Sequence, residues 1–163
     1  MSLERAKNWL ARYGLEGRIE EFEVSSATVE LAAKALGCEP SHIAKTLSFA
    51  MGEGCVLVVA AGDARVDNAR FKARFGTKAK MLPAEAVEPL VGHGVGGVCP
   101  FGVNEGVQVY LDESLRRFET VYPAAGTAAS AVRLALPELE KASGSLGWVD
   151  VCKGWQEAEA AQG

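Results

Sequence analysis

The sequence lacks several patterns that would assign a chemistry at once. It has no HExxH motif, no GxSxG motif and no cluster of His, Asp and Glu, and its only histidines, His42 and His93, lie in loop-like contexts. It also lacks the GK[ST] end of an ATPase phosphate loop and a GxGxxG motif after a first strand. We therefore expect no Ser–His–Asp triad, no metal and no cofactor.

Long apolar runs are also absent, because no stretch approaches the roughly 18 apolar residues of a membrane span. The opening residues MSLERAKNWL mix acidic and basic side chains and have no apolar region typical of a secretory signal. The length of 163 residues, with 48% hydrophobic and 23% charged residues, is typical of one globular domain. We expect a cytoplasmic protein with a single domain over residues 1–153 and a frayed tail over residues 154–163.

No two cysteines are close enough in sequence to form a CxxC pair. A zinc site and a disulfide framework are therefore both disfavoured, and buried or loop thiols in a reducing compartment are the simpler interpretation. The four cysteines are Cys38, Cys55, Cys99 and Cys152.

An excess of basic residues is missing too. The net charge of −4 argues against a stable, nonspecific binder of nucleic acid. A local basic segment nevertheless lies between residues 65 and 80, where only Asp67 opposes six cations. These cations form either a solvated helix face or a contact with phosphates. They are Arg65, Arg70, Lys72, Arg74, Lys78 and Lys80.

Hydrophobic periodicity and turn residues predict more strands than helices, without strict alternation. This pattern indicates an α+β fold in which helices surround a mixed sheet. The expected helices lie at 3–14, 25–37 with a serine cap at Ser26, 67–76, 83–92 and 137–143. The expected strands lie at 18–24, 45–51, 55–62, 78–82, 107–115, 119–122, 129–134 and 147–153, and the second and third form a hairpin.

Three features could carry chemistry, and the first is Lys45 at the start of an apolar strand. A lone lysine at a strand end commonly reaches solvent. The alternative is a cation held where water is scarce, where its ammonium attracts a carbonyl or phosphate oxygen strongly. The sequence around it leaves both interpretations open.

The other two features are loops rich in small residues. In GVGGVCPFGV, residues 94–103, several backbone N–H groups can point at one oxygen, or the glycines can simply allow a tight connection. In AAGTAAS, residues 124–130, small residues and two hydroxyls leave room for a ligand, or they form a plain turn.

Taken together and in order, these residues resemble the YbaK/EbsC family, freestanding relatives of the editing (insertion) domain of bacterial prolyl-tRNA synthetase. The resemblance runs from about Phe22 to Lys153, and its GxxxP loop corresponds to residues 96–100. The matching segments are IAKTLSFAM, AAGDARVDNARFKARFG, VGGVCPFG, VYPAAGTAASAVRL and WVDVCK.

The resemblance implies an α+β fold with a largely antiparallel sheet or partly open barrel surrounded by helices. It also implies metal-independent hydrolysis, in trans, of the ester that joins a wrong amino acid to tRNA. Lys45 would then anchor the substrate's 3′ end, and Cys99 need not be a nucleophile. The substrate would be bound by Gly96, Gly97, Val98, Cys99, Pro100, Phe101, Gly126, Thr127 and Ser130, and tRNA would be contacted by Arg65, Arg70, Lys72 and Arg74.

The implied substrate is tRNA(Pro) carrying Cys, Ala or another small amino acid. The amino acid stays open, because one methylene changes the binding free energy by only about 1–3 kcal/mol and a pocket therefore separates such groups weakly. The acceptor end of tRNA is the expected partner. A transient contact through residues 65–80 and Lys45, or recruitment by prolyl-tRNA synthetase, would allow binding despite the negative net charge of the protein. Two alternatives stay open: a noncatalytic module that binds tRNA or a synthetase, and a domain that binds a small molecule.

Overall fold

The computed structural model describes residues 2–23 and 28–156 and has an α+β fold with a mixed sheet, which confirms the predicted class. Six strands form the main sheet in the order β8-β6-β2-β3-β5-β9. Their bounds are β2 Ile43–Met51, β3 Gly54–Ala61, β5 Gln108–Asp112, β6 Thr120–Pro123, β8 Leu134–Ala135 and β9 Trp148–Val149.

The predicted hairpin of β2 and β3 forms the centre of this sheet. The two strands pair antiparallel from Ala44↔Ala61 to Met51↔Gly54, across a two-residue turn. Residues 56–61 of β3 are fully buried, as expected for an unbroken apolar strand covered on both faces. Parallel pairing of β2 with β6, and of β3 with β5 and then β9, completes the mixed and curled sheet.

Two small sheets complete the strand arrangement. β1 (Ile19–Glu21) pairs with β7 (Ser130–Val132), and β4 (Arg65–Val66) pairs with β10 (Cys152–Lys153). The segment predicted as one strand at 129–134 is therefore divided between β7 and β8, which pair with different strands. The strand predicted at 78–82 is reduced to an isolated bridge between Met81 and Phe49.

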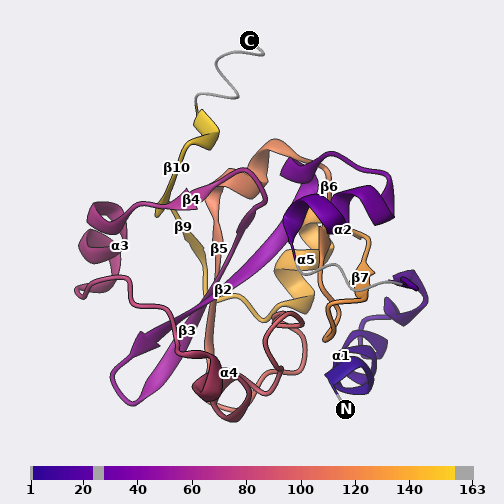
Figure 1. Cartoon of the computed structure of the whole chain (residues 1–163), viewed down its shortest axis with the longest axis horizontal. Coiled ribbons are helices and arrows are strands. Elements are labelled where there is room, and N and C mark those ends of the chain that lie inside the picture. The colour runs from indigo at the N-terminus through magenta and orange to yellow at the C-terminus, as the bar shows by residue number, and fades with distance from the viewer. Residues whose placement is uncertain (1, 24–27, 157–163) are drawn as a thin grey trace.

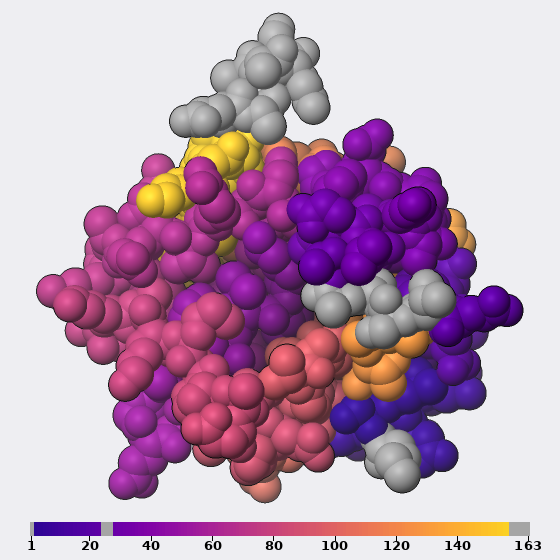
Figure 2. Space-filling model, viewed as in Figure 1, coloured from indigo at the N-terminus to yellow at the C-terminus, as the bar shows by residue number. Residues whose placement is uncertain are grey.

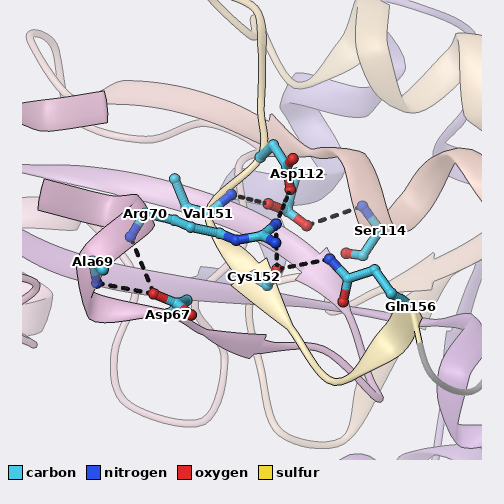
Figure 3. Close-up of polar contacts among 9 residues, drawn as sticks. Asp67, Ala69, Arg70, Asp112, Ser114, Val151, Cys152 and Gln156 are labelled. Carbon is cyan, nitrogen blue, oxygen red and sulfur yellow. Dashed lines mark hydrogen bonds and ion pairs between the residues drawn. The ribbon is translucent and has the colours of Figure 1, made fainter. Parts of the chain in front are cut away.

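The strand predicted at 147–153 is divided as well, and a buried carboxylate explains the division. Asp112 is fully buried and accepts hydrogen bonds from the backbone N–H groups of Ser114 and Val151, both at 2.9 Å (Figure 3). The hydrogen bond from Val151 to Asp112 takes Val151 out of the strand ladder, so that β9 joins the main sheet and β10 joins β4.

In the part of the chain that the structure describes, five α-helices and three short 3-10 helices accompany the strands. Figure 1 shows α2, α3 and α4 surrounding the crossing strands β2, β3 and β5. Asp67 caps α3, and Thr28 caps α2, whereas the predicted cap Ser26 lies outside the described residues. The helices are α1 Ser2–Ala11, α2 Val29–Leu36, α3 Asn68–Phe75, α4 Ala84–Val91, α5 Leu136–Ala142, η1 Glu16–Arg18, η2 Pro40–His42 and η3 Glu113–Arg117.

Candidate functional site

A cavity of about 380 Å³ opens between β2, α2, α4 and two loops, and Figure 2 shows a hollow between α2 (purple) and the pink to salmon surface of α4 and the loop after it. Its position follows from the pairing of β2. That strand pairs with β6 at Ile43 and Ala44 and is hydrogen-bonded to residues 80–82 at positions 48–50, and no pairing with its outer edge is described between these two places. The cavity occupies this gap, and Lys45, Thr46 and Ser48 line it.

Lys45 is half-buried in the wall of the cavity. Its ammonium donates hydrogen bonds to the backbone carbonyl of Gly62, at 3.3 Å, and to that of Ala64. Burial lowers the pKa of the ammonium, and the neighbouring Cys152 and Asp63 oppose this shift. Of the two interpretations of this lysine, the structure shows the water-poor one, although a role in chemistry stays a prediction.

The glycine-rich loop approaches the cavity at Gly96 and Val98, which line it. Gly97 contacts another loop instead, since a Cβ at this position would lie 2.2 Å from the carbonyl oxygen of Gly126. Gly126 in turn has a φ of 96° and packs against the backbone of Ser2. The missing side chains at these two positions therefore let three backbone segments pack together, and Gly96 is the glycine of this set that faces the cavity.

The rest of the predicted loop set lies behind the cavity wall. Cys99 and Phe101 are fully buried, and neither they nor Gly97, Pro100 and Gly126 are among the described lining residues. The sulfur of Cys99 lies 3.5 Å from Nε2 of His93, and burial raises the pKa of the thiol to about 12. At neutral pH this group is a protonated thiol, which is a poor nucleophile.

Thr127 and Ser130 also line the cavity, and the substrate contact that the family resemblance implies for them stays a prediction. Their hydroxyl oxygens lie 2.7 Å apart, and the Thr127 hydroxyl also accepts a hydrogen bond from the backbone N–H of Ala129 at 3.2 Å. The AAGTAAS segment is thus a hydrogen-bonded turn that also lines the cavity.

The four predicted tRNA contacts lie on β4 and α3, and none of them is among the residues that line the cavity. All four side chains are exposed. Arg70 forms an ion pair with Asp150 at 2.9 Å, and the guanidinium of Arg74 lies 5.2 Å from the ring centre of Tyr110. Arg65 and Lys72 are the other two members of the set.

Sequence reasoning missed several residues of the site. Thr46 lines the cavity, and its buried hydroxyl has no hydrogen-bond partner among the described residues. Its position next to Lys45 at the start of a strand was the available signal. α2 contributes Val29 and Ala32, and β6 contributes Tyr122, but no pattern along the chain indicates that these elements meet at β2.

Two further findings concern metals and membranes. Over residues 2–23 and 28–156, no three His, Cys, Asp or Glu side chains gather as a metal site requires. In the same part of the chain, no helix has both the length and the apolar character needed to cross a bilayer.

The fold and the cavity define an α+β domain in which a half-buried lysine and two loops of small residues line one cavity. The profile of the aminoacyl-tRNA editing domain matches residues 23–142, and the chain belongs to this family.

Individual relatives agree with this assignment. The chain is 49% identical to the "uncharacterized protein YwhH" of Bacillus subtilis (strain 168) over 158 residues, which cover 96% of this chain and 100% of that protein. It is 32% identical to the proline–tRNA ligase of Bacillus cytotoxicus over 88 residues, covering 53% of this chain but 16% of the ligase. A crystal structure described as "a putative trans-editing enzyme for prolyl tRNA synthetase" superposes with a TM-score of 0.84 at 30% identity, covering 94% of this chain and 98% of that one.

Proposed function

We propose that this protein is a trans-acting aminoacyl-tRNA deacylase that hydrolyses the ester of mischarged tRNA, with tRNA(Pro) carrying Cys, Ala or another small amino acid as substrate. One observation carries the proposal: Lys45, Gly96, Thr127 and Ser130, which are far apart in the sequence, line the same cavity. The relatives named for proline–tRNA ligase and for prolyl-tRNA editing support the choice of tRNA.

In this proposal, Lys45 anchors the 3′ end of the substrate. Two backbone carbonyls accept hydrogen bonds from its ammonium, which has three N–H donors, so one donor is left for an ester or phosphate oxygen. Neutral carbonyls orient the ammonium without cancelling its charge. Because water is scarce in the wall of the cavity, the attraction between this charge and an oxygen of the substrate is stronger than in bulk solvent.

The aminoacyl group would lie between Gly96 and the turn at Thr127 and Ser130. Backbone groups at Gly96 can approach its carbonyl and amine closely, because no side chain intervenes there. The buried hydroxyl of Thr46 is a further polar group available to it. An ester needs no strong protein nucleophile, and positioning a water molecule or the adjacent ribose hydroxyl supplies much of the acceleration.

The test is a deacylation panel. We expect the wild-type protein to hydrolyse Cys-tRNA(Pro) or Ala-tRNA(Pro), and Lys45→Ala to lower the rate about 100-fold or more, the usual cost of losing one group that stabilises developing charge. Lys141→Ala, which removes an exposed lysine of α5, is the matched control and should retain the wild-type rate.

Two outcomes would contradict the proposal. If the wild-type protein leaves the whole panel of small aminoacyl-tRNAs intact, it is not a deacylase of this class. If it binds tRNA in a Lys45-dependent manner but never turns over the ester, the noncatalytic binding module is the better description.

The proposed substrate also implies the predicted cytoplasmic location, because tRNA is aminoacylated there.

A further inference from the structure

The two carbonyl groups that hold Lys45 belong to one tight turn. Gly62 and Ala64 flank Asp63 in the connection from β3 to β4, and both carbonyl oxygens accept hydrogen bonds from the Lys45 ammonium. The turn also lies against η2, since a Cβ at Gly62 would come within 2.0 Å of the carbonyl oxygen of Pro40. The position of Lys45 therefore depends on what keeps this turn in place.

The helix η3 holds the turn from the other side. The guanidinium of Arg117 donates to both carboxylate oxygens of Asp63, from Nη1 to Oδ2 at 2.9 Å and from Nη2 to Oδ1 at 2.6 Å. Its Nε donates to the carbonyl of Ser114 at 2.9 Å, and the buried Ser114 hydroxyl accepts from the backbone N–H of Ala61 at 3.1 Å. Ala61 at the end of β3 and Asp63 in the turn after it are therefore both held by residues of η3.

This ion pair differs from an ordinary surface pair. The Arg117 side chain is 12% exposed, and its guanidinium lies 4.7 Å from the ring centre of Phe118 and 5.1 Å from that of Trp155. A planar guanidinium in a bidentate pair and stacked on rings is held in one orientation, and lysine cannot reproduce that geometry. The pair therefore engages both oxygens of the Asp63 carboxylate.

Asp63 is also a carboxylate whose charge acts on Lys45. Without its guanidinium partner, the Asp63 carboxylate would attract the ammonium more strongly and compete with the substrate for it. The other charged or titratable groups that act on Lys45 are the thiol of Cys152 in β10, the carboxylate of Glu30 in α2 and the guanidinium of Arg65 in β4. Of the two carboxylates in this set, the structure pairs Asp63 with Arg117.

We propose that Arg117 is a positioning residue for Lys45: by binding Asp63 it fixes the 62–64 turn and weakens the attraction between this carboxylate and the ammonium. Lys45 is then held by neutral carbonyl groups, and its positive charge stays available to an anionic or carbonyl oxygen in the cavity. The consequence for turnover rests on the proposed deacylase function, whereas the effect on Lys45 itself does not.

The first experiment measures Lys45 in the free protein. Lysine labelled with 13C at Cε is incorporated, the Lys45 resonance is assigned with Lys45→Arg, and its pKa is followed by NMR. We expect Arg117→Gln to raise the pKa of Lys45, because the freed Asp63 carboxylate stabilises the charged ammonium. The control Arg116→Gln removes a neighbouring arginine of η3 that has its own ion pair, to Glu113 at 2.9 Å, and its own ring contact, to Trp148 at 4.3 Å. This control should leave the pKa unchanged.

The second experiment uses deacylation to separate positioning from general destabilisation. Arg117→Gln should lower kcat/KM about 10-fold or more, and Asp63→Asn combined with Arg117→Gln should recover most of that loss, because the competing carboxylate is gone. Arg117→Lys should fall between wild type and Arg117→Gln. Thermal unfolding of each variant identifies any loss that comes from unfolding.

The inference is overturned if Arg117→Gln leaves the pKa of Lys45 unchanged, or if the double variant is no more active than Arg117→Gln. A wild-type protein without deacylase activity would contradict the proposed function instead. In that case the NMR comparison still decides whether Arg117 controls Lys45.

Discussion

Lys45 and Cys99 are both withdrawn from solvent, and burial shifts the pKa of each toward its neutral form. For Lys45 the neighbouring acidic groups oppose this shift. For Cys99 burial dominates, and the raised pKa makes a covalent role unfavourable at neutral pH. Sequence reasoning had already set aside a nucleophilic role for Cys99, because an ester needs none. Its complete burial could be known only from the packing of the loop.

The Cys99 shift predicts a pH dependence of stability. A thiol with a folded pKa of about 12 and an ordinary value of 9.0 holds its proton longer in the folded protein. Its stabilising contribution is therefore complete below about pH 9 and is lost as the pH rises toward 12, with a slope of at most about 1.4 kcal/mol per pH unit. Between pH 7 and pH 10.5, the free energy of unfolding measured with urea should decline less for Cys99→Ala than for wild type.

The control for this measurement is Cys38→Ala. Cys38 is only half-buried, and its removal should flatten the decline less than removal of Cys99 does. Equal slopes for wild type and Cys99→Ala would show that the Cys99 thiol does not stay protonated in the folded state.

At the scale of elements, the sequence predicts regular structure well and loop packing poorly. The β2–β3 hairpin is recognisable because β3 is continuously apolar and a glycine-rich turn precedes it. The glycine-rich loop could be located but not interpreted, because glycine permits close approach to a ligand or to another backbone. In the structure both occur within two residues, since Gly96 faces the cavity and Gly97 meets the Gly126 backbone.

This packing predicts a large effect of one methyl group. Gly97→Ala places a Cβ against backbone atoms of Gly126 and Thr127, which cannot turn aside as a flexible side chain can. We expect a loss of about 1–3 kcal/mol in the free energy of unfolding, the usual cost of overpacking, measured by urea denaturation. In Gly17→Ala the new methyl group meets no atom within 4 Å, so this variant should be nearly neutral. Equal stability of the two variants would contradict the described contact between the loops.

At the scale of the whole molecule, the net charge of −4 opposes binding of tRNA, which is the polyanionic substrate of the proposed function. The exposed cations of β4 and α3 provide a local surface of the required sign, but ion pairing and ring contacts already engage Arg70 and Arg74. Contact between this surface and tRNA stays a prediction. It requires only that cations reach phosphates, whereas in the proposed function the cavity binds the aminoacyl end.

The charge of α3 can be tested through salt dependence. Lys72→Glu should weaken tRNA binding and reduce the slope of log K against log salt by about 1 if Lys72 contacts one phosphate. Lys141→Glu makes the same change of charge on α5 and is the matched control. Equal weakening by both variants, measured by filter binding at several salt concentrations, would show a general charge effect and no contact at α3.

The sequence alone determined the α+β class, the central hairpin, the absence of familiar catalytic motifs and the two loops of small residues, because these depend on local periodicity, turn preferences and residue type. Only the tertiary structure decided that Lys45, Gly96 and Thr127 share one cavity, that Asp112 divides the last predicted strand, and that Arg117 binds Asp63 beside Lys45. These arrangements join segments tens of residues apart. They depend on how strands pair and how buried charges find partners, and neither leaves a periodic signal along the chain.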